Sequence, residues 1–503
     1  MLSLTDPAPV APCPAPFNLA RHVLAAAEAR PDHVALQIVG PAGAERWSYG
    51  RLSAAVRGVA TGLAARGLKP GDRVLLRLGN GVAFPLGFLG AVAGGFVPVP
   101  TAAGLTAGEV ARLCEVIRPS LIVAGAGVAL PEAPPCPVLP EGVLRGFEGL
   151  AEAGWAMGDP DRLGYIVLTS GTSGSPRAVA HAHRAVWARR MMRDGWLGLG
   201  PDDRLMHAGA LNWTYTLGAG LFDPWVAGAT AIILADGVSA DQIPLLARRF
   251  DATILAAVPG IYRRILERNP KLSLPRLRHG LSAGEKLPPA IRQRWREATG
   301  TDLHEAMGLS ECSTFLSSSP ARPAPEGATG HAQPGRRIAV LGAGGAPVPR
   351  GEPGILAVHR SDPGLCLGIF EGETIRPVTG DWFQTGDMVV MAEDGAITSL
   401  GRADDMLNAG GFRVSPAEIE AAMAACPGVT ASAAVELPVK DDVSVIALFY
   451  TGAAEEDALA AHAGAHLARY KQPRLYLRRA AIPVTANGKV NRRSLREEWK
   501  ATR

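Results

Sequence analysis

Short apolar runs recur along the chain, and they constrain its fold more than any other feature. They include "VALQIV" (34–39), "RVLLRL" (73–78), "SLIVAG" (120–125), "YIVLT" (165–169), "ATAIIL" (229–234) and "ATILAAV" (252–258). Stretches with helical periodicity, such as "PLLARRF" and "IYRRILERN", separate many of them. Fully apolar strands that alternate with helices are typical of parallel sheets covered by helices. The sequence therefore predicts an α/β protein with doubly wound, mostly parallel sheets.

The texture changes towards the C-terminus. A chain of 503 residues is longer than the chains that usually fold around one hydrophobic core. Past residue 330, turns rich in glycine and proline, as in "AVLGAGGAPVPRGEPGILAV", predict a small barrel-like or antiparallel β portion. Near "GRADD" (401–405) we expect a boundary, and "SPAEIEAAMAAC" then predicts a helix with Ser415 as N-cap and Pro416 in its first turn. We expect an N-terminal domain of residues 1–402 and a small, mobile α+β domain of residues 403–503.

Composition and charge exclude several classes of function. The formal net charge is only +4, and no basic run interleaved with aromatic residues indicates nucleic-acid binding. The six cysteines are scattered without a CxxC pair, which favours the reducing cytoplasm, and the proline-rich start does not resemble a signal peptide. The uncharged stretch 84–100 holds three prolines and four glycines, so we expect a buried helix that leads into a strand rather than a membrane span.

The stretch "YIVLTSGTSGSPRAVAH" (165–181) follows a predicted strand with hydroxyl groups, glycines and one cation, Arg177. Backbone N–H groups that no bulky side chain covers can hold an anion such as phosphate. The Walker pattern GxxxxGK[ST] is absent, and Pro176 stands where a helix would have to begin. A polar surface turn stays open as the alternative.

Further motifs accompany this loop in a fixed order. "MGLSEC" (307–312), "DWFQTGD" (381–387), "GRADD" (401–405) and "TANGKVNRR" (485–493) follow it along the chain. With "LTSGTSGSPRAVAH" they resemble the motifs of the adenylate-forming enzymes, which include acyl- and aryl-CoA ligases, peptide-synthetase adenylation domains and luciferases. The resemblance extends from about residue 20 to the C-terminus.

The resemblance implies a reaction in two steps. A carboxylate attacks the α-phosphorus of ATP and releases pyrophosphate, and the thiol of coenzyme A then displaces AMP from the acyl adenylate. Because both reactants of the first step are anions, the site must supply positive charge. By resemblance, Lys489, Glu311 and Arg177 are catalytic, and Glu311 also binds Mg²⁺. The nucleotide and its phosphates would contact Thr169, Ser170, Gly171, Thr172, Ser173, Gly174, Ala283, Gly284, Glu285, Met307, Gly308, Ser310, Asp387 and Arg402.

The chain departs from the family pattern at two of these positions. Arg177 stands where lysine is usual, and a guanidinium also binds phosphate well. Met307 replaces an aromatic residue that would stack on adenine, and plain core packing stays open for it.

The C-terminal motifs imply a second arrangement for thioester formation. Lysine supplies only seven of the 51 basic residues, so arginine is the usual cation of this chain. A lysine in "NGKV" therefore indicates a specific role for Lys489. An exposed surface lysine without such a role is the alternative. By resemblance Asp404 is the hinge, and Gly410 and Gly411 leave room for the pantetheine arm of coenzyme A. A plain glycine turn is the alternative for these two.

The segment "HAGALNWTYTLGAGLFDPW" (207–225) lies where the family binds its acid. By resemblance to benzoate-type CoA ligases, His207, Trp213, Thr214 and Tyr215 form the pocket, with Trp225 nearby. Aromatic core packing is the alternative for each ring. No buried cation for a second carboxylate is evident, and no histidine is given an acid–base role because the carboxylate is already ionised.

The leading hypothesis is an AMP-forming ligase that joins an aromatic or short-to-medium apolar carboxylic acid to coenzyme A, with ATP and Mg²⁺. An enzyme that loads a carrier protein is the alternative, and a nucleotide-binding regulator without catalysis is a third possibility. We expect small-molecule partners, no nucleic acid and no membrane span, and the sequence leaves a homodimer open.

Overall fold

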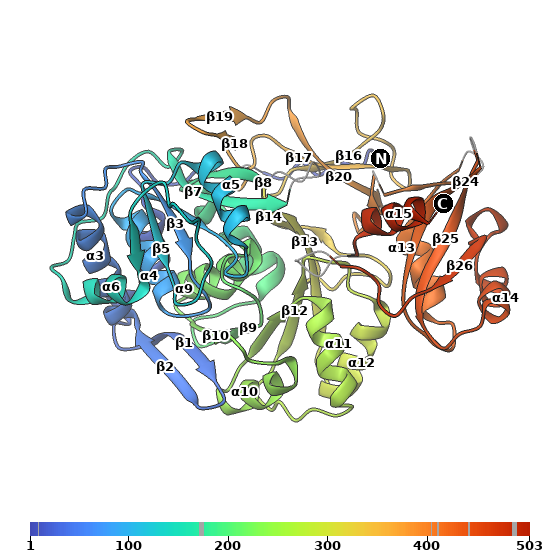
Figure 1. The fold of residues 1–503 in the computed structure, drawn as a ribbon, viewed down its shortest axis with the longest axis horizontal. Coiled ribbons are helices and arrows are strands. Elements are labelled where there is room, and N and C mark those ends of the chain that lie inside the picture. The colour runs from blue at the N-terminus through green and yellow to red at the C-terminus, as the bar shows by residue number, and fades with distance from the viewer. Residues whose placement is uncertain are drawn as a thin grey trace. The chain divides into compact units, whose positions relative to one another are not determined.

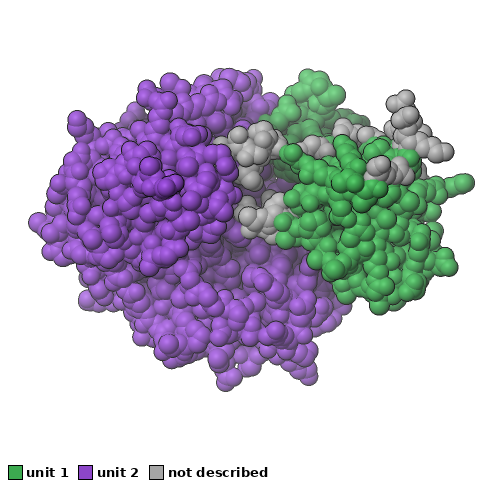
Figure 2. Space-filling view, in the orientation of Figure 1, with its two compact units in different colours: residues 1–4, 338–357, 384–503 green, residues 5–337, 358–383 purple. Residues whose placement is uncertain are grey.

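The computed structural model describes residues 1–503 except 9, 171–175, 404, 410–411, 441–442, 485–489 and 503. The chain forms two compact units, which Figure 2 shows in different colours. Unit 1 comprises residues 1–4, 338–357 and 384–503, and unit 2 comprises residues 5–337 and 358–383. The predicted division into domains of residues 1–402 and 403–503 stays a prediction.

A large, mostly parallel sheet forms the centre of unit 2 (Figure 1). Its order is β15-β14-β13-β12-β11-β9-β10-β1-β2. The strands from β13 to β1 in this order pair in parallel, whereas β14, β15 and β2 add antiparallel edges. The bounds are β1 Val34–Gly40, β2 Gly43–Ser48, β9 Arg204–His207, β10 Thr230–Leu234, β11 Ile254–Ala257, β12 His279–Ala283, β13 Leu303–Leu309, β14 Ser313–Ser317 and β15 His331–Ala332.

Helices cover both faces of this sheet, because its strands are apolar on both sides. Ile232 and Leu255 pack in one core cluster with α10 (Ile243–Arg249), α11 (Pro259–Arg268) and α12 (Pro289–Thr299). The neighbouring residues Ile233 and Ile254 point to the opposite face, where they join other clusters. The predicted doubly wound α/β fold is confirmed.

A second parallel sheet in unit 2 has the order β4-β3-β5-β6. Its strands are β3 Arg73–Arg77, β4 Val97–Pro100, β5 Leu121–Ala124 and β6 Val138–Pro140, and the helices beside them are α3 Tyr49–Ala65, α4 Ala83–Ala93, α5 Ala107–Ile117 and α6 Glu141–Arg145. Every residue of α4 is buried, and β4 follows it, as the prediction for residues 84–100 required. Across the described part of the chain, no helix has the length and apolar character that crossing a membrane needs.

A third sheet, β19-β18-β8-β7, carries the phosphate-loop sequence. Its strands are β7 Leu163–Ser170, β8 Pro176–Ala182, β18 Gly368–Glu371 and β19 Thr374–Pro377, all paired antiparallel. The remaining helices of unit 2 are α1 Leu19–Val23, α2 Ala26–Ala29, α7 Arg184–Trp187, α8 Arg190–Met192 and α9 Asp223–Ala227.

Unit 1 contains the β-rich portion and the C-terminal α+β portion that the sequence predicts. The first is a sheet of β16 Ile338–Leu341, β17 Pro353–His359, β20 Trp382–Met391 and β21 Ile397–Arg402. A short hairpin, β22 Leu407–Ala409 and β23 Phe412–Val414, follows. The last sheet is β24 Val429–Lys440, β25 Val443–Gly452 and β26 Leu475–Arg478, with helices α13 Pro416–Ala424, α14 Glu456–His466 and α15 Arg492–Ala501.

The alternation of small apolar residues along β24 explains how this last sheet is covered. Ala434 packs in the cluster of α13 and α14, and Ala433 packs in the cluster of Leu495 from α15. Ser415 is the N-cap of α13, as predicted, but its hydroxyl donates to the Leu400 carbonyl instead of capping the helix.

Candidate active site

The predicted phosphate loop connects two antiparallel strands rather than a strand and a helix. Thr169 pairs with Arg177 on the neighbouring strand β8. This agrees with the absence of the Walker pattern, which requires a helix after the loop. The exposed Arg177 helps to line a surface hollow, together with Arg118 and Arg376. Gly171, Thr172, Ser173 and Gly174 lie outside the described residues, as does the side chain of Ser170.

The "MGLSEC" motif forms the end of β13 and the turn into β14. A β-bulge interrupts their pairing at Met307 and Gly308. A Cβ on Gly308 would lie 2.4 Å from the Ser313 carbonyl oxygen, so only glycine fits this crossing. Ser310 and Glu311 follow with half-buried side chains.

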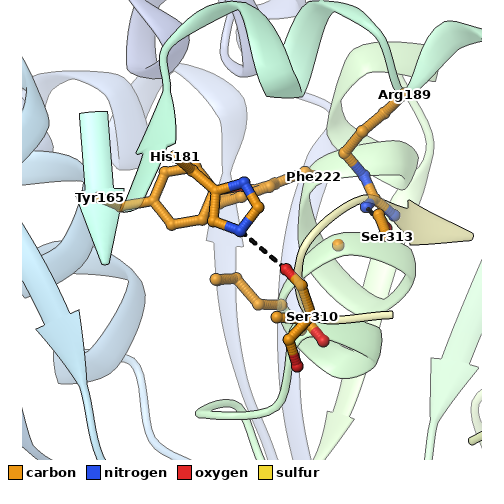
Figure 3. Close-up of a pocket in the computed structure, with 9 residues that line it drawn as sticks. Tyr165, His181, Arg189, Phe222, Ser310 and Ser313 are labelled. Carbon is orange, nitrogen blue, oxygen red and sulfur yellow. Dashed lines mark hydrogen bonds between the residues drawn. The ribbon is translucent and has the colours of Figure 1, made fainter. Parts of the chain in front are cut away.

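Two hydrogen bonds hold the backbone of this motif. The Nε2–H of His181, on β8, donates to the Ser310 carbonyl at 2.8 Å (Figure 3). The Cys366 amide donates to the Glu311 carbonyl at 2.7 Å. Burial lowers the pKa of His181 to about 4, although its bond to Ser310 acts the other way. His181 is therefore neutral near pH 7, and its bond holds the Ser310 backbone, a contact that the sequence did not predict.

Ala283, Gly284 and Glu285, which the resemblance assigns to nucleotide binding, lie beside this motif. Ala283 ends β12 and pairs in parallel with Ala306, so Gly284 and Glu285 leave the sheet next to Met307. Ligands bind at the carboxyl ends of parallel strands in doubly wound folds. The structure thus brings these two predicted nucleotide segments together at one edge.

The predicted acid segment begins at His207, the last residue of β9, and contains a π-helical stretch, η3 (Thr216–Phe222). The rings of His207 and Tyr215 meet edge-on with centroids 4.3 Å apart. Tyr215 donates from its hydroxyl to the Leu281 carbonyl at 3.1 Å. His207 is 1% exposed, its two ring nitrogens have no partner among the described residues, and burial lowers its pKa to about 3.

A small cavity of about 20 Å³ opens beside this segment. It is lined by Tyr165, His181, Arg189, Thr214, Leu217, Gly218, Phe222, Ser310 and Ser313 (Figure 3). Of the four residues predicted for the pocket, Thr214 lines this cavity, whereas His207, Trp213 and Tyr215 do not. Trp225 is fully buried and donates to the Ala35 carbonyl at 2.8 Å, so it belongs to the core. Ser310, which belongs to the "MGLSEC" motif, also lines the cavity.

The cavity also contains a buried cation, which the sequence analysis did not find. Arg189 is 8% exposed and Asp223 is 6% exposed. The guanidinium donates to both carboxylate oxygens of Asp223, from Nε at 2.8 Å and from Nη2 at 2.6 Å. Burial raises the pKa of Asp223, and the Arg189 guanidinium opposes this shift. The Nη1 atom of Arg189 donates to the Ser313 hydroxyl at 2.5 Å.

Asp387 and Arg402, which the resemblance also assigns to nucleotide binding, are neighbours in unit 1. Asp387 on β20 lies opposite Arg402 on β21, and their charged groups are 3.5 Å apart. Arg402 also donates to the Thr385 carbonyl at 2.7 Å. Asp404, Gly410, Gly411 and Lys489 lie outside the described residues, so their roles stay predictions.

Two family models match this chain. The model described as AMP-binding enzyme matches residues 23–370, and the model described as AMP-binding enzyme C-terminal domain matches residues 418–489. The chain belongs to the AMP-binding enzyme family. The resemblance to the adenylate-forming enzymes is thereby confirmed.

Relatives of this AMP-binding enzyme include two aryl-CoA ligases. The 3-hydroxybenzoate–CoA ligase of Aromatoleum sp. (strain CIB) is 29% identical over 93% of this chain and 94% of its own length. The benzoate–CoA ligase of Thauera aromatica is 30% identical over 86% of both chains. Among solved structures, a benzoate CoA ligase from Burkholderia xenovorans LB400 superposes with a TM-score of 0.84 at 27% identity, over 95% of this chain and 100% of that one.

The described residues suit a metal ion that arrives bound to the nucleotide. They do not form a metal site made of protein side chains alone. Among the described residues, no three histidine, cysteine or carboxylate side chains are grouped closely enough to hold a metal ion. Mg²⁺ commonly binds through one or two carboxylates, with substrate phosphates and water completing its coordination. A single carboxylate such as Glu311, held on an anchored backbone, suits that mode.

Proposed function

We propose that this AMP-binding enzyme is an aryl-CoA ligase whose acid is aromatic or compact and apolar. The enzyme uses ATP, Mg²⁺ and coenzyme A. The carboxylate attacks the α-phosphorus of ATP to form an acyl adenylate and pyrophosphate, and the thiol of coenzyme A then forms the thioester and releases AMP. The observation that carries the proposal is that Ser310 belongs to both the nucleotide motif and a cavity with aromatic walls.

The walls of the cavity support a flat acid. Tyr165 and His181 are cross-strand partners whose rings stack at 4.8 Å and 8° (Figure 3). Phe88 packs against both Tyr165 and Phe222, with ring centroids 5.7 and 5.6 Å apart. These rings give one side of the cavity an aromatic surface, against which an aromatic acid can pack. The names of the relatives, which are ligases of benzoate and of 3-hydroxybenzoate, support the same class of acid.

The proposal assigns the charged residues to the two steps. Glu311 would hold Mg²⁺ at the phosphates, and Arg177 would bind the β- and γ-phosphates. Asp387 would accept hydrogen bonds from the ribose hydroxyls. Lys489 would neutralise the charge that builds up between the carboxylate and the α-phosphate, since both reactants are anions. Rotation of residues 403–503 at Asp404 would then replace Lys489 by the glycine-lined passage for coenzyme A.

A panel of carboxylic acids tests the proposal. Pyrophosphate release is measured with ATP and Mg²⁺, in the presence and in the absence of coenzyme A. We expect benzoate-type acids to give pyrophosphate, and AMP and thioester to accumulate only with coenzyme A. Turnover with a phosphopantetheinylated carrier protein but not with coenzyme A would favour the carrier-loading alternative. If no acid causes release of pyrophosphate, the proposed ligase function is wrong.

The setting of the enzyme is part of this proposal. All six cysteines are free, and four of them are buried. Unpaired thiols persist in a reducing compartment, which supports a cytoplasmic location. Assembly as a homodimer also stays a proposal, and light scattering of the purified protein measures it.

A further inference from the structure

The cavity wall opposite its aromatic side chains is polar and rigidly built. The Arg189 guanidinium lies against Gly218, where an added Cβ would be 2.2 Å from Cζ. Gly218 belongs to the π-helical stretch η3, and Asp223 follows that stretch directly. One continuous segment therefore supplies both the backbone on which the guanidinium packs and the carboxylate that neutralises it. The third support, Ser313, comes from β14.

Counting donors shows that this arginine retains unused capacity. A guanidinium carries five N–H groups. Among the described residues, two N–H groups of Arg189 donate to Asp223 and one donates to Ser313. One hydrogen on each terminal nitrogen is left without an acceptor there. His181 lines the same cavity and donates from Nε2, so its Nδ1 is an acceptor, and this atom has no partner among the described residues. The cavity thus offers fixed donors and an acceptor to its occupant.

The balance of charge defines the kind of group that suits these donors. Asp223 neutralises Arg189, and both side chains are more than nine-tenths buried. A second carboxylate on the acid would bring an uncompensated negative charge into this buried wall, which is costly. A hydroxyl adds no charge and can both accept and donate a hydrogen bond. A methyl group of similar size would leave the donors without a partner.

We propose that Arg189, fixed by Asp223, Ser313 and Gly218, is a specificity-determining residue, and that the acid carries a neutral hydrogen-bonding substituent such as a hydroxyl group. This inference rests on the proposed function, because it takes the cavity as the part of the acid site that holds the substituent. It adds a requirement that aromatic walls alone do not impose. An acid without such a substituent, or with a second carboxylate, is then a poorer substrate.

The experiment compares benzoic acids that bear a hydroxyl, a methyl or a second carboxylate at the same ring position. The ratio of kcat/KM for the hydroxy acid to that for the methyl acid is measured by pyrophosphate release. We expect the wild-type ratio to be at least about 10 at one ring position, as a lost hydrogen bond to a charged donor predicts. The double variant Arg189→Met/Asp223→Leu removes the pair without leaving a lone buried charge, and its ratio should fall to about 1.

A matched control is the pair of Arg278 and Asp203, which has the same fork-like contacts at 3.1 and 2.6 Å. It lies at the opposite, amino-terminal ends of β9 and β12. Arg278→Met/Asp203→Leu should keep the wild-type ratio. If Arg189→Met/Asp223→Leu does not fold, Arg189→Lys keeps the charge but loses the fork, and it too should lower the ratio.

The outcomes separate this inference from the function beneath it. If no acid releases pyrophosphate, the proposed function fails and the inference falls with it. If acids are activated but the wild type does not prefer the hydroxy acid, or prefers the dicarboxylic acid, only the inference is overturned. A ratio that survives in both Arg189 variants overturns it as well.

Discussion

Substitution of Glu305 tests how burial of one carboxyl group changes stability with pH. The group lies on β13, the strand that ends in the "MGLSEC" motif. Glu305 lies on β13 just before Met307 and is 4% exposed. Its carboxylate accepts from the Leu287 amide at 3.0 Å and from Arg292 at 3.2 Å. Burial outweighs both contacts and raises the pKa of Glu305 from 4.5 to about 7. The folded state therefore holds a proton there that the unfolded state releases between these two pKa values.

The sign of the pH effect follows from this difference. The stabilisation by the protonated carboxyl is fully present below pH 4.5 and is lost as the pH rises through about 7. From about pH 5 to about pH 8, the Glu305 carboxyl should lower the free energy of unfolding by about 2.5 kcal/mol. Glu305→Gln keeps an oxygen for the Leu287 amide and does not titrate. The difference in stability between variant and wild type should therefore shift by this amount in favour of the variant.

Urea unfolding followed by tryptophan fluorescence measures this difference at each pH. All tryptophans except Trp499 belong to unit 2, so the signal reports almost entirely on the unit that contains Glu305. Each pH is compared between wild type and Glu305→Gln, which cancels the titration of other groups. A stability difference that stays constant from about pH 5 to about pH 8, within about 0.5 kcal/mol, would refute the raised pKa.

Three further predictions concern the reaction. His181→Phe keeps a ring against Tyr165 but loses the bond to the Ser310 carbonyl, so kcat for pyrophosphate release should fall about tenfold; an unchanged kcat contradicts the positioning role. Gly308→Ala should raise the KM for ATP more than about tenfold because its Cβ would meet backbone at 2.4 Å, whereas Gly260→Ala, which faces open space, should not. Lys489→Ala should abolish adenylate formation and spare thioester formation from a supplied acyl adenylate; equal loss in both steps contradicts its assignment.

The parts of the fold that the sequence predicts are strands and helices formed by contiguous stretches of residues. The apolar runs at 229–234 and 252–258 became β10 and β11, and the uncharged stretch at 84–100 became the buried helix α4 and strand β4. The helix after Ser415 begins where its N-cap predicts. Contiguous patterns suffice here because burial on both faces leaves a local mark in composition.

The parts that the sequence did not predict depend on residues far apart in the chain. Arg189, Asp223 and Ser313 are ordinary in their own segments, and only the fold makes them neighbours. The same holds for His181, whose partner Ser310 follows much later in the sequence. Trp225 shows the converse, because an aromatic residue in the expected segment turned out to belong to the core.

The contacts of His181 and Arg189 decide which substitutions can separate acid selection from nucleotide binding. His181 lines the cavity proposed for the acid and also donates to the Ser310 carbonyl, so a change there should alter acid selection and nucleotide binding together. Arg189 bonds to Asp223 and to Ser313, which stands on β14 beyond the motif. Its removal should therefore change the ranking of acids while the KM for ATP moves little. A change in both quantities would mean that the loss of Arg189 disturbs the motif through Ser313, which pairs with Leu309 and whose carbonyl packs against Gly308.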